Sequence, residues 1–484
     1  MADLAPPPAP SGPFEGPEKL LEIWFAPSAA DCPDAASSTD GKFGLRRVPR
    51  PVWEEMLDIV KCKILSAVEG TETDAYLLRS ELEWPTHTTI CDLLYALALS
   101  RTGAAFCVGV IVESSFFVSP HRLILKTCGT TLNLLGVPRI LEIARDHAGL
   151  PSVYRLFYSR KAFMFPERQI GPHREWKAEI EFLDNLFPNG SAYTVGKVNG
   201  DHWLLYLTSP GDSSSPNGDT APNSPIVPHG TYPPIPSTSA AAESSAINGD
   251  ADDADDTIAS DYTIEILMTN LSPEGRAPFF NKTPPEDADA TAGADGMALS
   301  SEIGISNLFP EHLTTLDAYS FSPCGYSCNA LLKWRPDAGQ NPSRPGEGYY
   351  TIHVTPEEGW SYASFECNVP LPTSSTDKPT SVPDLKTLIR RVVDIFRPGR
   401  LTLTLFISSK DNDAAEEEEG ESAVEAAQRA FKSALTLPPK RSGRGDDAGE
   451  RGGAFAGLYK RTDKINYEFG GYDLAFASFE LRSS

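Results

Sequence analysis

The chain has 484 residues, of which 40% are hydrophobic, and its 66 acidic and 42 basic residues give a formal net charge of −24. This length and apolar content indicate a folded protein with one large domain or two or three ordinary ones. The negative charge argues against a nucleic-acid partner, because neutralising phosphates requires clustered Lys and Arg. Residues 1–13 lack the basic and apolar regions of a signal peptide, and the apolar runs are too short to span a membrane. We therefore predict a cytosolic protein without a membrane partner.

Apolar spacing near 3.6, which indicates amphipathic helices, occurs in four stretches: residues 51–67, 138–148, 174–186 and 384–396. Alternation with a period of two, which indicates strands, occurs in four others: residues 123–128, 261–268, 362–366 and 401–406. The two patterns together predict an α/β or α+β protein with mostly antiparallel strands.

The predicted strands have one polar face each. Alternation puts Asp261 and Glu265 on one side of their strand, Lys126 and Cys128 on one side of another, and Ser364 beside Glu366 on a third. A sheet with such strands can carry helices on its second, apolar face.

Three stretches are rich in small and acidic residues and poor in large apolar ones: residues 209–256, 282–300 and 408–453. Such segments bury too little apolar surface to offset the entropy lost on ordering. We predict that all three are disordered insertions into one domain, because patterned sequence resumes after each of them.

Motif blocks along the chain carry a family resemblance. They lie at residues 14–25, 113–131, 157–161, 179–183, 187–190, 323–327, 350–353 and 361–366. In this order the blocks resemble the eukaryotic, fungal-like S-adenosylmethionine decarboxylase proenzymes, which are pyruvoyl-dependent. The resemblance implies an α+β fold with four layers, α/β/β/α, in which two antiparallel sheets face each other and helices lie outside.

The resemblance also implies that the chain makes its own cofactor. Cleavage between Glu113 and Ser114 would leave a β chain, residues 1–113, and an α chain, residues 114–484, that begins with a pyruvoyl group made from Ser114. The pyruvoyl ketone would form a Schiff base with the substrate amine and draw electrons from the bond that breaks. No pyridoxal phosphate is implied. No metal is expected either, because Cys324 and Cys328 lack a second Cys/His pair.

Further roles are implied residue by residue. Cys128 matches the proton donor, His353 and Ser327 match residues that assist processing, and Glu15 and Glu18 match active-site acids. The residues that match substrate-binding positions are Phe14, Glu113, Phe321 and Glu357. Without the resemblance, Cys128, His353 and the phenylalanines would be interpreted as core residues.

An effector site for putrescine is the last implied feature. The matching residues are Glu22, Lys126, Phe157, Asp261, Thr263, Glu265, Glu366 and Phe406. Several carboxylates around one ammonium should have raised pKa values unless a further cation enters. The alternative is that Asp261 and Glu265 lie on a solvated strand face beside an acidic linker.

One segment departs from the family pattern. In the family, a strand reading approximately Ala-Tyr-Leu-Leu-Ser-Glu-Ser-Ser runs directly into the cleavage site, whereas residues 79–112 here separate Leu78 from Glu113. A true insertion would interrupt that strand and would have to preserve its register. Our hypothesis is that residues 79–112 are an intron translated by error in the gene model, so that the active protein would lack them.

Two classes of function compete. The first is a decarboxylase that acts on S-adenosylmethionine to supply the aminopropyl donor for spermidine and spermine synthesis. The second is a catalytically dead paralogue that regulates an active partner. Retention of Ser114, Cys128, Ser327 and His353 favours the enzyme. The family resemblance allows either a monomer of processed chains or a homodimer.

Overall fold

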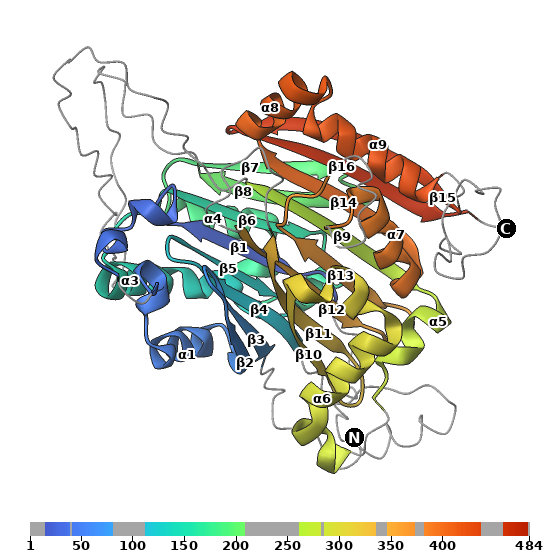
Figure 1. Cartoon of the computed structure of the whole chain (residues 1–484), viewed down its shortest axis with the longest axis horizontal. Coiled ribbons are helices and arrows are strands. Elements are labelled where there is room, and N and C mark those ends of the chain that lie inside the picture. The colour runs from blue at the N-terminus through green and yellow to red at the C-terminus, as the bar shows by residue number, and fades with distance from the viewer. Residues whose placement is uncertain are drawn as a thin grey trace, which may run out of the picture.

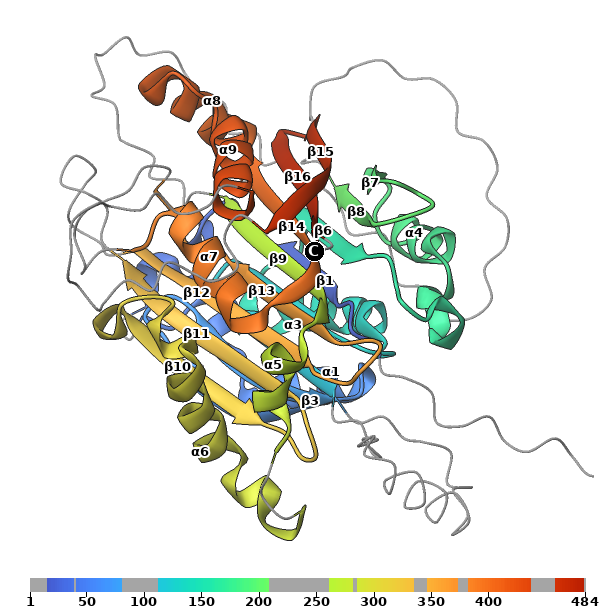
Figure 2. The same ribbon diagram turned by 90° about the vertical axis from the view of Figure 1, so that its right-hand side faces the viewer.

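The computed structural model describes residues 15–38, 41–80, 112–208, 261–281, 285–334, 346–372, 382–436 and 458–482. Two eight-stranded antiparallel sheets face each other, and helices lie on their outer faces (Figures 1 and 2). The predicted four-layer arrangement is therefore confirmed. In the described part of the chain, no helix is both long and apolar enough to cross a membrane.

The first sheet has the strand order β2-β3-β4-β5-β1-β6-β8-β7. Its strands are β1 (Lys19–Trp24), β2 (Cys62–Glu69), β3 (Asp74–Ser80), β4 (Val112–Val118), β5 (Arg122–Thr127), β6 (Arg155–Lys161), β7 (Gly190–Gly196) and β8 (His202–Thr208). Helices α1 (Arg50–Ile59), α3 (Val137–Ala148) and α4 (Trp176–Asp184) cover its outer face through an apolar cluster that includes Trp53, Ile140 and Leu183.

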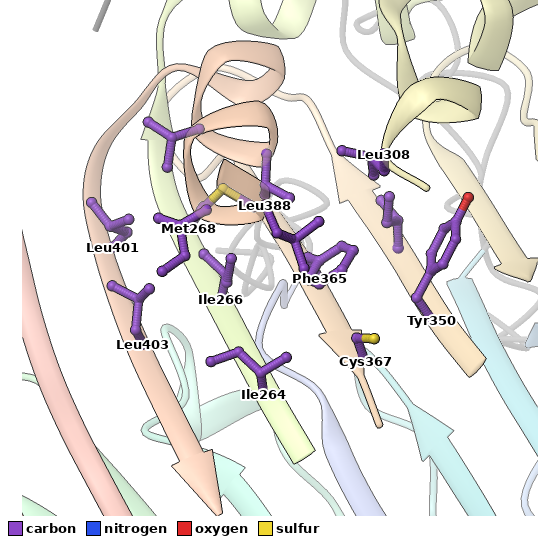
Figure 3. Packing of buried hydrophobic residues seen from close by; sticks show 14 of the residues in the cluster. Ile264, Ile266, Met268, Leu308, Tyr350, Phe365, Cys367, Leu388, Leu401 and Leu403 are labelled. Atoms are coloured by element: carbon purple, nitrogen blue, oxygen red, sulfur yellow. The ribbon is translucent and has the colours of Figure 1, made fainter. Parts of the chain in front are cut away.

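The second sheet has the order β10-β11-β12-β13-β9-β14-β16-β15. Its strands are β9 (Tyr262–Leu271), β10 (Thr314–Ser320), β11 (Tyr326–Trp334), β12 (Gly346–Thr355), β13 (Tyr362–Cys367), β14 (Pro398–Ser408), β15 (Tyr459–Phe469) and β16 (Tyr472–Leu481). The helices of this half are α5 (Pro273–Arg276), α6 (Pro285–Ile303), α7 (Leu385–Phe396), α8 (Ser409–Glu419) and α9 (Ala423–Leu435). Figure 3 shows Leu388 of α7 packed on Ile266, Met268 and Phe365 of the sheet.

Both sheets have the same topology. If eight is added to each strand number of the first sheet, the order of the second sheet results. The chain is therefore built from two topologically equivalent halves, whose sheets meet at their inner faces.

The structure corrects two predictions of disorder. Helix α6 occupies most of residues 282–300, and α8 and α9 occupy much of residues 408–453. Helix α9 orders because Val424, Ala427 and Phe431 share a buried stripe, and the Ser422 side chain caps its first turn. Composition concealed this stripe because half of the buried residues of α9 are alanine. The third predicted insertion, residues 209–256, lies outside the described residues.

One helix is shorter than predicted. Helix α1 ends at Ile59, and β2 begins at Cys62, so the predicted helix over residues 51–67 is wrong in its second half. Lys61 has a φ of 62°, in the left-handed region, and this turn separates the two elements.

Candidate active site

Strand β4 carries the predicted cleavage site and forms an antiparallel pair with β3. Leu78 lies opposite Ser114, Arg79 opposite Glu113 and Ser80 opposite Val112. The expectation that residues 79–112 interrupt a single strand is therefore wrong. Residues 81–111 lie outside the described residues, and they connect two strands that already lie side by side. An insertion at such a connection leaves the register of the hairpin unchanged.

Ser114 is fully buried on the face of β4 that points toward the helices. Its Oγ lies 3.2 Å from the Oγ of Ser80, which in turn lies 3.4 Å from the Sγ of Cys62. Cys62 belongs to the apolar cluster beneath α1 and α3. The Ser114 hydroxyl therefore does not face His353 and Ser327.

Ser115 occupies the opposite, inter-sheet face, because neighbouring residues of a strand point to opposite sides. Its Oγ lies 2.7 Å from Asn329 Oδ1, 3.0 Å from Thr351 Oγ1 and 3.0 Å from His353 Nε2. The other ring nitrogen of His353, Nδ1, lies 2.9 Å from Ser327 Oγ. The structure thus brings His353 and Ser327 together, as predicted. Sequence reasoning missed Ser115, Asn329 and Thr351, although strand alternation separates Ser115 from Ser114.

Cys128 follows directly after β5, next to the scissile segment. Thr127 pairs with Ser114, so the next position along each strand places Cys128 beside Glu113. The backbone around the thiol is fixed on several sides. Lys19 Nζ donates to the Gly129 carbonyl at 2.7 Å, Gly129 N donates to the Glu15 carbonyl at 3.2 Å, and Thr131 Oγ1 donates to the Cys128 carbonyl at 2.8 Å.

Glu15 and Glu18 have different surroundings. The Glu15 carboxylate accepts hydrogen bonds from the backbone N–H groups of Met164 and Phe165 at 2.7 and 2.8 Å, so it fixes a loop. The Glu18 carboxylate faces the second sheet, where Ser364 donates to it at 2.6 Å and Tyr362 at 3.1 Å. Burial raises the pKa of both acids.

Lys126 and Glu366 form the centre of an acidic cluster between the sheets. Lys126 Nζ lies 2.7 Å from Glu366 and 3.7 Å from Glu18, and all three side chains are almost fully buried. Glu265 pairs with Glu366 across β9 and β13, and Thr404 donates to its carboxylate at 3.2 Å. Burial raises the pKa of Glu265 to about 7, and the charge of Glu366 adds to this rise. The predicted alternative of a solvated strand face is therefore wrong for Glu265.

Glu22 and Asp261 extend the cluster along the sheets. Burial raises the pKa of Glu22 to about 7, although Arg122 lies 3.4 Å away and Trp24 donates to the carboxylate at 2.7 Å. Tyr472 donates to Asp261 Oδ2 at 2.6 Å, whereas the buried Oδ1 has no hydrogen-bond partner among the residues that the structure describes. Burial raises the pKa of Asp261 as well.

Three aromatic rings stand beside Asp261. Phe406 stacks on Tyr472 at 4.6 Å between ring centroids, and Phe157 meets these two rings edge-on at 5.4 and 5.1 Å. Thr263 pairs with Phe406 across β9 and β14. The guanidinium of Arg155 lies 4.7 Å above the Tyr472 ring and contacts its hydroxyl. The residues predicted for the effector site therefore lie along one inter-sheet surface.

The structure describes the side chains of two of the four predicted substrate-binding residues. Phe14 and the side chain of Glu113 lie outside what the structure describes. Phe321 follows β10 and Glu357 follows β12, and both are buried. Since β10 and β12 each pair antiparallel with β11, they run in the same direction. Phe321 and Glu357 therefore emerge at the same end of the second sheet.

The fold and this site define a class: α+β proteins with a buried polar site between two facing eight-stranded antiparallel sheets. The family model described as adenosylmethionine decarboxylase matches residues 11–82 and 98–480. The chain belongs to this family. The unmatched residues 83–97 fall inside the segment that departs from the family pattern.

The curated relatives support the same assignment. The S-adenosylmethionine decarboxylase proenzyme of Xenopus laevis is 33% identical over 395 residues, which cover 82% of this chain and 83% of the relative. The Saccharomyces cerevisiae proenzyme is 30% identical over 423 residues, which cover 83% and 84%. A crystal structure of a Trypanosoma brucei AdoMetDC monomer covers 76% of this chain and 99% of that one at 19% identity, with a TM-score of 0.44.

Proposed function

We propose that this chain is a cytosolic proenzyme that cleaves itself between Glu113 and Ser114 and then decarboxylates S-adenosylmethionine. The product would be the aminopropyl donor for spermidine and spermine synthesis. The observation that carries the proposal is the position of β4: its first residues lie beside Cys128 of the same sheet and contact His353 of the facing sheet.

Self-cleavage needs a nucleophile, a carbonyl and a base. The Ser114 oxygen bonds to the Glu113 carbonyl carbon, and breaking the C–N bond frees the Ser114 nitrogen and leaves an ester. A base then removes the Cα proton of residue 114, the Glu113 carboxylate departs, and water replaces the nitrogen to give a ketone and ammonia. His353 suits the role of base, because burial holds its pKa well below the usual range and the imidazole is therefore neutral.

The surroundings of Ser114 fit the pyruvoyl group that would replace it. Residue 114 is fully buried, and Cys128 lies near it at an exposure of only 3%. Bound at this position, the group supplies an electron sink for decarboxylation. Cys128 would deliver a proton to the decarboxylated carbon, and the hydrogen bonds around Gly129 hold the thiol in place.

Putrescine, a diamine with two positive charges, would offset the excess negative charge between the sheets. Among the described residues, the five carboxylates of the acidic cluster meet three cations, Lys126, Arg122 and Arg155. The unpartnered Asp261 Oδ1 offers a buried acceptor for an ammonium, and the neighbouring rings offer cation–π contact. A diamine between the sheets would stabilise the charged carboxylates.

A homodimer is also part of the proposal. Strand β15 is an edge of the second sheet, and an edge strand presents backbone groups that a second copy can pair with. Tyr467 on this strand is 43% exposed. Sedimentation of the processed protein would distinguish a dimer from a monomer.

The decisive experiment is the intact mass of the purified protein and of Ser114→Ala. The wild type should yield two chains that meet at Glu113 and Ser114, the second with a pyruvoyl terminus, whereas Ser114→Ala should remain whole. A wild-type chain that stays intact would favour the dead paralogue. Cleavage of Ser114→Ala at the same bond would contradict the role of Ser114.

A further inference from the structure

Lys19 is a fully buried cation on the outer face of the first sheet. It lies on β1, directly opposite Thr127 of β5 and Arg160 of β6. Its Nζ donates to the Gly129 carbonyl at 2.7 Å and lies 5.2 Å from the centre of the Phe163 ring. Burying an ammonium is costly unless charged or polar groups replace its hydration. The groups around Lys19 therefore have to offset this cost.

Glu179 of α4 has the largest effect among the charges that act on Lys19. Its carboxylate already has other partners. Arg160 lies 2.7 Å away, the Tyr158 hydroxyl donates to it at 2.5 Å, and His173 Nδ1 lies at 2.8 Å. Burial alone would raise the pKa of Glu179, but the hydrogen bonds from His173 and Arg160 hold it below the ordinary value. Neutralising Glu179 therefore does not require Lys19, which is a second cation beside it.

The hydrogen bond of Lys19 goes instead to the turn that follows β5. Gly129 has a φ of 62°, in the left-handed region, so the chain turns directly after Cys128. The Gly129 carbonyl receives Lys19 on one side and Gln169 Nε2, at 3.4 Å, on another. The Gly129 N–H donates to the Glu15 carbonyl at 3.2 Å. The turn that carries the Cys128 thiol is thus bound to β1 through both groups of one peptide unit's neighbours.

The charges around Lys19 include the proposed proton donor itself. Burial lowers the pKa of Lys19 to about 8, and three negative groups act against this fall. In order of effect, these are Glu179, Glu15 and the thiolate form of Cys128. Electrostatic interaction is reciprocal, so the ammonium favours the charged form of each of them.

From this arrangement we infer that Lys19 is a positioning residue for proton delivery by Cys128. Its hydrogen bond to Gly129 holds the turn that carries the thiol, and its charge stabilises the thiolate that remains after delivery. Glu179 and Arg160 form the charged surroundings that keep the ammonium in place. The inference rests on the proposed function, because it concerns the proton that completes the decarboxylation. It also gives a task to the motif blocks 157–161 and 179–183.

The proton can reach either of two carbon atoms. In the normal course the S–H bond of Cys128 breaks, a C–H bond forms at the substrate carbon that lost carbon dioxide, and water later returns a proton to the thiolate. When the carbon of residue 114 is protonated instead, hydrolysis leaves the substrate nitrogen on that residue as an alanine terminus and releases an aldehyde. A displaced or less acidic thiol should favour this second course, because proton transfer depends on geometry and driving force.

Lys19→Met should therefore raise the number of self-inactivated chains per turnover. Loss of one hydrogen bond from a charged donor corresponds to about a tenfold effect. The measurement is the intact mass of the α chain after a known number of turnovers, which distinguishes an alanine terminus from a pyruvoyl terminus. Unfolded chains neither turn over nor inactivate, so a loss of stability alone does not change this ratio. Lys19→Arg keeps a cation that can donate to Gly129, and it should bring the ratio back toward the wild-type value.

The matched control is Lys161→Met. Lys161 follows Arg160 on β6, so its side chain points to the opposite face of the sheet. Its ammonium is also largely buried, at 11% exposure, and lies 3.0 Å from Asp201. Its loss should leave the ratio of inactivation to turnover unchanged. Thermal unfolding identifies a variant that fails to fold, and Lys19→Gln, a neutral polar side chain one bond shorter, then replaces Lys19→Met with the same expected result.

A second measurement needs no turnover. In Ser114→Ala, which should remain an uncleaved precursor, adding Lys19→Met should speed amide hydrogen exchange in residues 129–131, because the turn loses its contact with β1. Adding Lys161→Met should not. A folded Lys19 variant with the wild-type ratio of inactivation to turnover would overturn the inference, as would unchanged exchange in this turn. A wild-type chain that is not cleaved would instead overturn the proposed function.

Discussion

Replacing Lys126 by methionine removes the cation at the centre of the acidic cluster and keeps a side chain of similar length. Lys126 is 1% exposed, and it contacts Glu366 at 2.7 Å and Glu18 at 3.7 Å. Glu265 lies in the same cluster, and the positive charge of Lys126 lowers its pKa. The substitution therefore leaves three buried carboxylates without their principal cation.

The expected cost follows from this burial. Removing one partner of a buried ion pair costs about 3–5 kcal/mol, because the remaining charge stays desolvated. Lys177 on α4 gives the contrast, since its side chain is 82% exposed and its pair with Glu181 lies at the surface. Lys177→Met should change the free energy of unfolding by less than about 0.5 kcal/mol.

The loss should depend on pH with a definite sign. Burial raises the pKa of Glu18 and Glu265 above the ordinary value, and without Lys126 both would rise further. A carboxyl group whose folded pKa is raised is protonated in the folded protein at low pH, where it carries no charge to repel its neighbours. The cost of Lys126→Met should therefore be largest above pH 7 and should decrease toward pH 5.

Urea unfolding at pH 5.5, 7 and 8.5 measures this cost, with Ser114→Ala as the background so that one uncleaved chain unfolds. Adding Glu366→Gln to Lys126→Met should recover part of the stability at pH 8.5. A loss below about 1 kcal/mol that does not vary with pH would show that the carboxylates are solvated or already neutral, and the reasoning would fail.

Four further outcomes are expected. Cys128→Ala should self-cleave normally, while its steady-state decarboxylation falls by about 10²-fold or more, as for loss of a proton donor; undiminished turnover would assign Cys128 to packing. Putrescine should raise the activity or the processing rate of the wild type, bind more weakly below pH 7 because raised-pKa acids protonate, and act less on Glu265→Gln; a flat wild-type response without a thermal shift would remove the effector site. Arg155→Gln should increase the response to putrescine, because it removes a cation from beside Tyr472; an unchanged dose–response curve would contradict competition between the two cations. A peptide map of active protein should lack residues 79–112 if they come from an intron wrongly included in the gene model, whereas peptides that continue past Leu78 into this segment would show a true insertion.

Sequence alone identified the family and named most of the residues that the structure places between the two sheets. Several of these features are local, so they can be recognised without knowledge of the fold. They are the motif around Ser114, the positions of Cys128 and His353, and the polar alternation of Asp261 and Glu265. Period-two alternation also predicts that Ser114 and Ser115 lie on opposite faces of a strand. It leaves open which face meets His353, because that depends on how the second sheet packs.

Tertiary structure decided what rests on contacts between distant residues. The strand before residue 81 and the strand after residue 111 became neighbours in a hairpin, so an apparent interruption became a connection. Helix α9 is ordered because its buried alanines pack against the second sheet, and amino-acid composition does not reveal that contact. The raised pKa of Glu265 and the contacts of Ser115 with Asn329 and His353 both require the two sheets to meet face to face, since the burial and the hydrogen-bond partners come from residues more than a hundred positions away in sequence.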